Sequence, residues 1–538
     1  MARTDKVRDA KALDAIVIGA GSNGLAAAAT LGRAGRRVLV LDSSDRLGGV
    51  SRTVEFAPGF HAAPLGLDAG WLPPAVARGI GMGIGDLADT EPAIGATVAS
   101  ASGELIALPC DARQAADRIR GFSSRDAGRW PDFVARLRAL ASFLEAMYQL
   151  PPPDLDASLS FGEVAPLLGL GRKFRSLGRD DMTELLRVLP MSVQDLAEEW
   201  FEHEALRAAI AAGGVRDIRQ GPRSGGTSFV LLHHLVGAPP GSVRARGWWR
   251  DGPDAFTVTA EALARKAGVA IRTGATVHRI VVKDDAVRGV VLANGDEIAA
   301  PIVISTADPV RTLLGMVDPV WLDPEFLRAV GQIKMRGCTA FVMYALDGLP
   351  DVAGLPDPKA ALASMVSLTP TTEGLERSYD AAKYGHVSEH PHVEFTIPSL
   401  RWPRLAPEGK QVLVARAQYA PYRLRDGATW DAARSSVLAD CVTSAICRVM
   451  PKLANHVVAR SVLSPVDLER TFGLTEGAVS QGEITLDQIL FMRPVPGWGR
   501  YAMPIDGLYL GGAGAHPGPG ILGASGWLAA RRALSFRA

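Results

Sequence analysis

The chain has 538 residues, of which 47% are hydrophobic and 21% are charged. This size and composition exclude a small binding module and a mainly disordered chain. Lysine and arginine total 58 against 57 aspartate and glutamate residues, so the formal net charge of +1 supplies no basic field, and we expect no nucleic-acid partner.

The first residues predict neither an export signal nor a membrane span. Charged residues of both signs occupy positions 3–11, and glycine interrupts the apolar stretch that follows. We therefore expect a cytoplasmic protein, and contact with a membrane surface and self-association are both left open. The four cysteines form no Cys-x-x-Cys pair, which predicts reduced and mostly buried thiols with no metal site.

A β-α-β unit is predicted over the first 42 residues. The apolar run at 14–19 is typical of a buried parallel strand, and an alanine-rich helix is expected over 22–34, ending before Gly35. A second apolar strand follows at 36–42.

Between the first strand and the helix, Gly19, Gly21 and Gly24 fit the pattern G-x-G-x-x-G. The first glycine permits a tight turn, the second lets a pyrophosphate approach the backbone, and the third allows the helix to pack on the strand. Asp42 ends the second strand, where an acid binds the adenosine ribose. These features predict a dinucleotide site at Gly19, Gly21, Ser22, Asn23, Gly24, Asp42 and Ser43.

Further along the chain, residues 110–250 are expected to be mainly helical, with a core helix over 229–236. Asn294-Gly295 predicts a hairpin turn. The remaining patterns predict helices at 260–267, 430–450 and 521–534, and strands at 269–273, 277–283, 289–292, 298–305, 339–346, 392–397, 411–417 and 508–510.

Just after the β-α-β unit, the run Asp45 to Thr53 resembles the FAD-dependent oxidoreductases that include amine oxidases and phytoene desaturases. In that group the Arg-x-Gly-Gly run contacts FAD, so the resemblance implies that Arg46, Gly48 and Gly49 lie near the diphosphate and ribityl chain. Paired glycines allow close approach of a ligand to the backbone. An ordinary Gly-Gly loop is the alternative interpretation of this run.

The stretch 506–526 resembles the C-terminal flavin signature of phytoene desaturase-like proteins. A helix N-terminus there would stabilise negative charge on the pyrimidine side of a reduced flavin. The resemblance implies flavin contacts at Gly512, Gly514, Gly520, Ile521 and Leu522, and an adenine contact at Val277.

Other segments are similar to one branch of this group, that of pyridine nucleotide-disulfide oxidoreductase domain-containing protein 2, so that the resemblance covers nearly the whole chain. These segments are 397–399, 406–409, 418–421, 464–469, 493–494 and 504–507. The resemblance implies an α/β fold with a discontinuous Rossmann-like FAD-binding domain (1–75, 248–310 and 470–538). A mixed α+β substrate domain (76–247 and 311–469) completes it.

By the same resemblance, the expected reaction is dehydrogenation (desaturation) of an apolar or amphipathic, isoprenoid- or carotenoid-like substrate by hydride transfer to FAD. No second G-x-G-x-x-G motif in strand-to-helix context occurs, so oxygen or a quinone is the expected external electron acceptor. A flavin-dependent amine oxidase and a non-catalytic flavin-binding interaction protein are the alternatives.

No catalytic acid or base is assigned from the sequence. His516 lies in the C-terminal motif, where a structural role and a role beside the flavin are both open. His61 and Arg52 follow the first flavin motif and could reach the mouth of the active site, but a structural role is the favoured interpretation for both. His233 and His234 are adjacent, so their side chains diverge, and we reject a metal site there.

Overall fold

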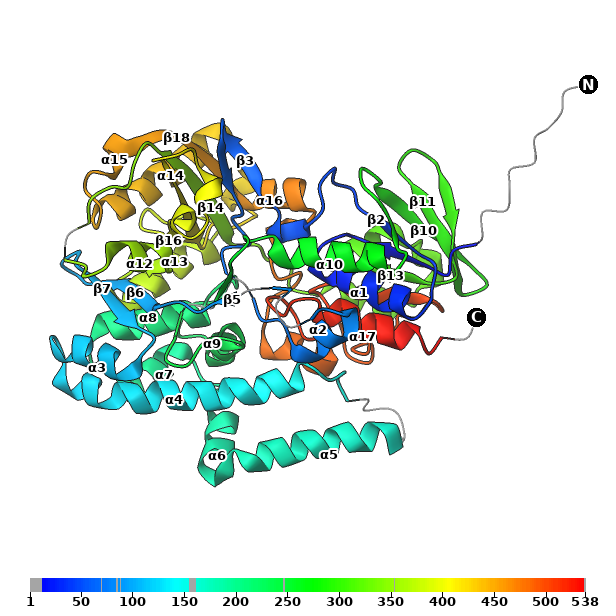
Figure 1. Cartoon of the computed structure of the whole chain (residues 1–538), viewed down its shortest axis with the longest axis horizontal. Helices are drawn as coiled ribbons and strands as arrows, with labels where there is room; N and C mark the ends of the chain where they lie inside the picture. The colour runs from blue at the N-terminus through cyan, green and yellow to red at the C-terminus, as the bar shows by residue number, and fades with distance from the viewer. Residues whose placement is uncertain are drawn as a thin grey trace, which may run out of the picture.

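A five-stranded parallel sheet forms the centre of one lobe of the computed structural model (Figure 1). In spatial order its strands are β19 (Leu508–Leu510), β13 (Val303–Ser305), β1 (Ala15–Ile18), β2 (Val38–Leu41) and β9 (Ala270–Arg272). Four of its strands are apolar and largely buried, as in a sheet covered on both faces, and the edge strand β9 is mostly exposed. The structure describes residues 12–68, 70–83, 86–87, 89–153, 161–244, 247–352 and 354–536.

Helices α1 (Ser22–Arg33), α10 (Ala255–Lys266) and α17 (Ala524–Ala533) pack together beside this sheet, and α2 (Pro74–Ile80) joins them. The approach of α17 to α1 requires glycine: a Cβ at Gly526 would lie 1.8 Å from the carbonyl oxygen of Asn23. An antiparallel sheet of β10 (Val277–Lys283), β11 (Ala286–Leu292) and β12 (Glu297–Ala299) extends from the same lobe.

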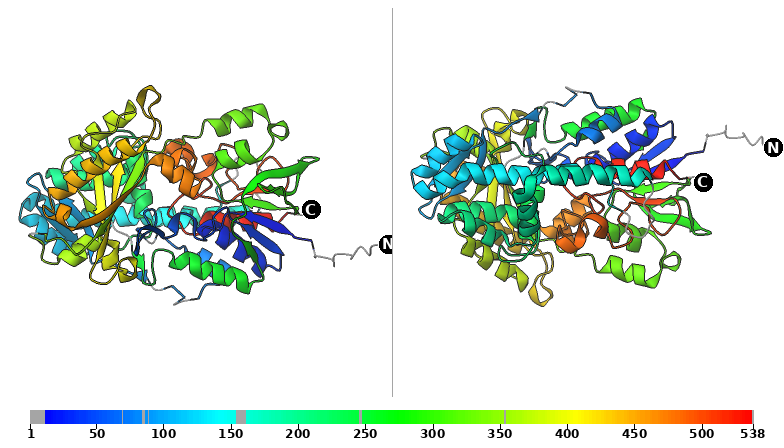
Figure 2. Two further views of the ribbon diagram at one scale, coloured as in Figure 1. Left: turned by 90° about the horizontal axis from the view of Figure 1, so that it is seen from above. Right: turned by 90° about the horizontal axis from the view of Figure 1, so that it is seen from below.

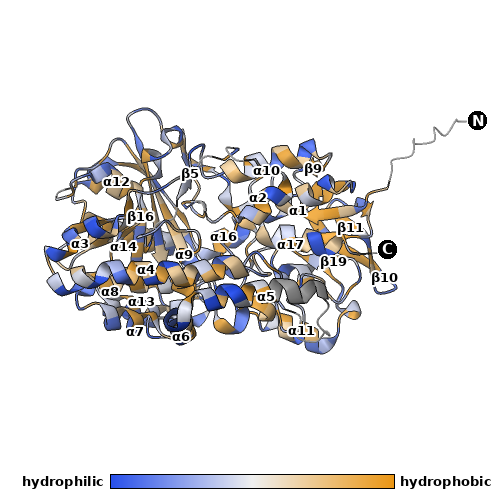
Figure 3. Cartoon of the chain, turned by 60° about the horizontal axis from the view of Figure 1, so that its bottom comes forward, coloured by the Kyte–Doolittle hydropathy of each residue, from blue (hydrophilic) through white to orange (hydrophobic). Residues whose placement is uncertain are grey.

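The second lobe is built on a seven-stranded sheet, antiparallel except where β15 pairs with β6. Its hydrophobic strands lie inside the lobe (Figure 3). In spatial order they are β18 (Val457–Leu463), β14 (Thr339–Leu346), β17 (Gln411–Gln418), β16 (His392–Thr396), β15 (Val366–Ser367), β6 (Ile94–Ala99) and β7 (Leu105–Pro109).

Helices of residues 112–235 cover the side of the molecule that is seen from below (Figure 2, right). They are α3 (Ala112–Arg120), α4 (Ser124–Met147), α5 (Phe161–Ser176), α6 (Gly178–Val188), α7 (Val193–Trp200), α8 (Glu204–Gly214) and α9 (Thr227–Leu235). The other helices are α11 (Pro324–Gly331), α12 (Pro358–Ala363), α13 (Thr372–Lys383), α14 (Ala432–Cys447), α15 (Leu453–His456) and α16 (Pro465–Phe472).

Two short antiparallel pairs complete the described strands. β3 (Val54–Ala57) pairs with β4 (Phe60–Ala62) and packs on the seven-stranded sheet, and β5 (Asp89–Thr90) pairs with β8 (Trp248–Trp249). A Rossmann-like parallel sheet beside a mixed α+β lobe confirms the predicted fold class.

Three details differ from the sequence prediction. The strand expected at 298–305 is divided between two sheets at Pro301, which has no backbone N–H to continue a ladder. The helix expected from 521 begins at Ala524, because Ile521 pairs with Trp71 in an isolated β-bridge. Only Cys338 of the four free cysteines is fully buried.

No helix in the described part of the chain is both long enough and apolar enough to cross a membrane.

Candidate functional site

A cavity of about 600 Å³ lies at the carboxyl edge of the parallel sheet. Its walls come from the loops that follow β1, β2, β13 and β19, together with residues 249–257, 275–277 and 469–474. In open α/β sheets, ligands bind outside the carboxyl ends of the strands, so this position is that of a nucleotide site. The volume lies within the ~300–1,000 Å³ typical of small-molecule sites.

Two glycine-rich loops meet on the wall of this cavity. A Cβ built on Gly21 would meet the Cα of Gly49 at 3.6 Å, an ordinary contact distance. Gly19 has a φ of +97° and so makes the tight turn that only glycine adopts readily. The two loops therefore leave bare backbone on the cavity wall, where a phosphate could approach.

Asp42 is held at the end of β2 by two backbone amides. Its Oδ2 accepts a hydrogen bond from the amide of Ala20 at 2.6 Å, and its Oδ1 accepts one from Ser44 at 2.8 Å. The carboxylate is thereby fixed beside the first glycine loop, with acceptor capacity left for ribose hydroxyls.

The structure brings eleven of the sixteen predicted cofactor-binding residues to the cavity wall. They are Gly19, Gly21, Ser22, Asn23, Asp42, Ser43, Gly49, Val277, Gly520, Ile521 and Leu522. Gly24, Arg46, Gly48, Gly512 and Gly514 are not among the lining residues.

Packing and turn geometry explain why glycine occupies positions 24 and 48, which do not line the cavity. A Cβ at Gly24 would lie 1.8 Å from the carbonyl oxygen of Gly19, so this position admits only glycine. Gly48 has a φ of +113° and donates its N–H to the carbonyl of Ala20. Arg46 is exposed, away from the wall.

In the C-terminal turn, Gly512 and Gly514 pack against the strand-end segment 306–309. A Cβ at Gly512 would lie 2.4 Å from the carbonyl oxygen of Thr306, and one at Gly514 would lie 2.2 Å from Cδ of Pro309. The residue between these two glycines, Ala513, lines the cavity instead.

The residues of the cavity fit a dinucleotide. Asn23 lines the cavity in the first turn of α1, and no described atom forms a hydrogen bond with its buried Oδ1. The free N–H groups of this helix N-terminus, and the glycine backbone beside them, are suited to a pyrophosphate. The N-terminus of α17 lies beside that of α1, since a Cβ at Gly526 would meet the carbonyl oxygen of Asn23, and α17 begins two residues after Leu522, which lines the cavity. The positive end of a second helix is therefore near the same space.

Two buried side chains hold the C-terminal wall in place, Arg493, to which the sequence analysis gave no role, and His233, which it considered only as a metal ligand. Arg493 donates from Nε and Nη2 to the carbonyl of Ala513 at 3.0 and 2.7 Å, and burial lowers its pKa to about 10. His233 connects the hydroxyl of Tyr148 to the carbonyl of Pro519, at 2.8 and 2.9 Å. Buried charged or polar residues in apolar runs were the available signal for both.

The candidate side chains near the flavin motifs are placed as follows. His516 is buried and bonds the carbonyl of Leu150 through Nε2 at 3.2 Å, and burial lowers its pKa to about 4. His61 lies in β4, outside the lining residues. Arg52 lines the cavity and stacks over Phe472 at 4.9 Å, and burial lowers its pKa.

Sequence comparison gives a family and two relatives. A family model described as an NAD(P)-binding Rossmann-like domain matches residues 17–75. The chain is 32% identical over 537 residues to pyridine nucleotide-disulfide oxidoreductase domain-containing protein 2 of Rattus norvegicus, covering 95% of this chain and 92% of the relative. It is 25% identical over 538 residues to the neurosporene-forming phytoene desaturase of Rhodobacter capsulatus, covering 94% and 91%.

Solved structures share the fold along most of the chain. An oxidoreductase from Methanosarcina mazei aligns with a TM-score of 0.58 at 15% identity, over 97% of this chain and 100% of that chain. Cyclohexylamine oxidase from Brevibacterium oxydans aligns with a TM-score of 0.53 at 14% identity, over 97% and 98%. At these identities the likeness concerns architecture alone.

Proposed function

The chain belongs to the family of pyridine nucleotide-disulfide oxidoreductase domain-containing protein 2, and on this premise we propose that it is an FAD-dependent dehydrogenase. Its substrate is an amphipathic, isoprenoid-like molecule, as the relationship to a phytoene desaturase suggests. The observation that carries the proposal is that the Gly19–Asn23 loop and the Gly520–Leu522 segment line the same cavity. A dinucleotide in this cavity would extend from the ribose acid Asp42 to the positive end of α17.

Bound FAD would supply the two-electron acceptor for the hydride that a dehydrogenation removes from the substrate, and an external quinone or oxygen would reoxidise it. The family model names NAD(P), but we assign FAD. The reason is that residues 518–522, which belong to the segment that resembles a flavin signature, line the same cavity as the N-terminal glycine loop.

This chain's own residues would bind, orient and exclude water. The backbone of Gly21 and Gly49 would accommodate the diphosphate, Asp42 the ribose, and Val277 the adenine. Around the remaining space, Trp249, Phe256, Phe472 and Leu522 form apolar walls that would exclude water from the reacting carbons.

The first test is the visible absorption spectrum of the purified protein, with the chromophore released by acid and identified by mass. Oxidised-flavin bands released as FAD are the expected result. A colourless protein that also fails to take up added FAD would refute the proposal.

Substrate class is tested by anaerobic bleaching of the flavin bands. Amphipathic isoprenoids are expected to bleach the flavin and to yield products two hydrogens lighter. Bleaching by amines alone, with peroxide formed in air, would instead indicate an amine oxidase.

A further inference from the structure

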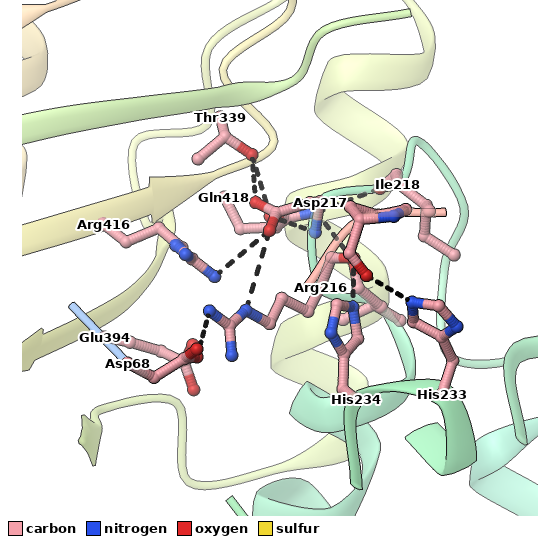
Figure 4. Close-up of polar contacts among 12 residues, drawn as sticks. Asp68, Arg216, Asp217, Ile218, His233, His234, Thr339, Glu394, Arg416 and Gln418 are labelled. Atoms are coloured by element: carbon pink, nitrogen blue, oxygen red, sulfur yellow. Dashed lines mark hydrogen bonds and ion pairs between the residues drawn. The ribbon is translucent and has the colours of Figure 1, made fainter. Parts of the chain in front are cut away.

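Beside the cavity, the interior of the second lobe contains a cluster of charged side chains (Figure 4). They come from the loop after β4, the segments after α8 and α9, and strands β16 and β17 with the turn between them. We call this set the ionic cluster; its members are Asp68, Arg216, Asp217, Arg244, Glu394, Arg401 and Arg416.

A chain of ion pairs leads from the cavity into the cluster. Asp68 lines the cavity, and its Oδ2 accepts a hydrogen bond from Nη2 of Arg216 at 2.9 Å. Nε of Arg216 and Nη1 of Arg416 lie 3.6 and 3.5 Å from the same Oδ2 atom of Asp217. Side-chain exposure falls along this path, from 24% at Asp68 through 15% at Arg216 to 5% at Arg416. Asp68 is thus the member of the cluster that lines the cavity, and burial increases from it to Arg416.

The two arginines have hydrogen-bond capacity that the protein does not use. Among the residues that the structure describes, no atom accepts a hydrogen bond from Nε of Arg216 or from Nε and Nη1 of Arg416. Arg416 also lies over the ring of Phe341 at 5.6 Å, which supplies no acceptor atom. Two of these three atoms, Nε of Arg216 and Nη1 of Arg416, face Asp217 only at the ion-pair distances of 3.6 and 3.5 Å. Buried guanidinium donors that form no hydrogen bond are costly, so this arrangement favours a ligand that brings oxygen atoms.

The charge balance of the cluster favours an anion. Although burial opposes ionisation, Arg244 lowers the pKa of Glu394 to about 2, so this group is ionised at neutral pH. Burial lowers the pKa of the adjacent His392 to about 4, so this imidazole is neutral there. Burial lowers the pKa of Arg401 to about 10, and it remains charged. Four guanidinium groups thus face three carboxylates, which leaves one buried positive charge in excess.

We propose that Arg216 and Arg416 bind the carboxylate of an amphipathic substrate whose apolar chain lies in the adjoining cavity. The planar guanidinium groups match the two oxygens of a carboxylate, and the apolar walls at Leu65 and Trp249 contact its chain. This inference rests on the proposed function and deepens it: the substrate is an acyl or isoprenoid acid. The excess positive charge disfavours amines, and a pure hydrocarbon would leave the arginine donors unpaired.

The test compares three probes with the same ten-carbon chain: decanoate, decanol and decylamine. Binding to the FAD-loaded protein is measured by isothermal titration calorimetry and, in parallel, by the flavin difference spectrum. Decanoate is expected to bind about 10- to 100-fold more tightly than decanol, the range for a charge-assisted pair, and decylamine more weakly than both. Equal binding of decanoate and decanol would overturn the inference, and this comparison needs no mutation.

Single substitutions test whether the preference for decanoate over decanol depends on the ionic cluster. Arg416→Gln should abolish the preference for decanoate, while decanol binding and FAD content remain as in the parent protein. Arg223→Gln is the matched control, because this arginine is 53% exposed and pairs with Glu373 on the surface; it should keep the full preference. If Arg416→Gln keeps the preference as well, the carboxylate is bound elsewhere and the inference fails.

The two proposals fail separately. Protein that holds FAD and shows no carboxylate preference refutes only the substrate inference. Protein without FAD refutes the proposed function, and calorimetry with decanoate on the same sample still decides whether the carboxylate site exists.

Discussion

Replacement of Gly21 by alanine separates the binding of the cofactor from the stability of the fold. Gly21 precedes α1 with a φ of −81°, which any residue can adopt, and its Cβ would make an ordinary 3.6 Å contact with Gly49. We therefore expect the free energy of unfolding of the apoprotein to change by no more than about 1 kcal/mol, as for an exchange at a helix N-cap.

The added methyl group would cover bare backbone where the two glycine loops meet, on the cavity wall that a diphosphate would approach. Losing one or more charge-assisted hydrogen bonds to phosphate costs about 1.5–3 kcal/mol, which corresponds to roughly 10- to 150-fold weaker FAD binding. FAD titration of the apoprotein, followed by flavin fluorescence, measures this loss, and urea unfolding measures stability.

Gly24→Ala is the informative contrast, because its Cβ would lie 1.8 Å from the carbonyl oxygen of Gly19. We expect that variant to lose stability by about 1–3 kcal/mol or more through overpacking. If Gly21→Ala binds FAD as tightly as the parent protein, the cavity wall at these two loops is not the diphosphate site and the reasoning is refuted.

Three further predictions follow from single side chains. Asp42→Ala removes the acceptor of two backbone amides, so we expect the free energy of unfolding to fall by about 1–3 kcal/mol and FAD to bind about tenfold more weakly; unchanged FAD affinity would contradict the ribose assignment. The pKa of buried His516 is about 4 against an ordinary 6.5, so the unfolded chain binds the proton first and stability should fall, by up to about 3 kcal/mol, as the pH drops from about 6.5 to 4. Urea unfolding across this range should give a smaller pH slope for His516→Phe, and an equal slope would exclude this cause. Gly526→Ala should destabilise the protein, because its Cβ would lie 1.8 Å from the carbonyl oxygen of Asn23. The control is Gly128→Ala, on an exposed part of α4 with nothing within 4 Å, which should be neutral or stabilising by up to about 1 kcal/mol. Similar melting temperatures for the two variants would count against close packing of α17 on α1.

Local sequence patterns were sufficient for the β-α-β unit and the glycine loop. Gly19, Gly21 and Asp42 lie within one short strand-helix-strand segment, whose periodicity and turn residues specify its geometry without help from distant residues. The strands β14 and β17 were also predictable, because their apolar runs are long and bounded by polar turns.

Contacts between distant segments were not predictable from one sequence. Ile521 follows a helix-forming pattern, yet its pairing with Trp71, 450 positions earlier, holds it outside α17. The ionic cluster did leave a signal, since Glu394 and Arg416 stand inside otherwise apolar strand patterns. That signal shows a buried charge but not its partners, which come from segments far away along the chain.

The parallel sheet also has a consequence for the order in which the protein can be completed during synthesis. β1 pairs with β13, nearly 290 residues later, and β13 pairs with β19 at 508–510. A nascent chain that ends before 508 lacks an edge strand, and it also lacks the 518–522 wall of the cavity. The segment 17–75, which carries the glycine loop, supplies only two of the five strands. Contacts of such long range form slowly, so a ligand that spans this cavity would stabilise the folded chain only once synthesis has passed residue 522.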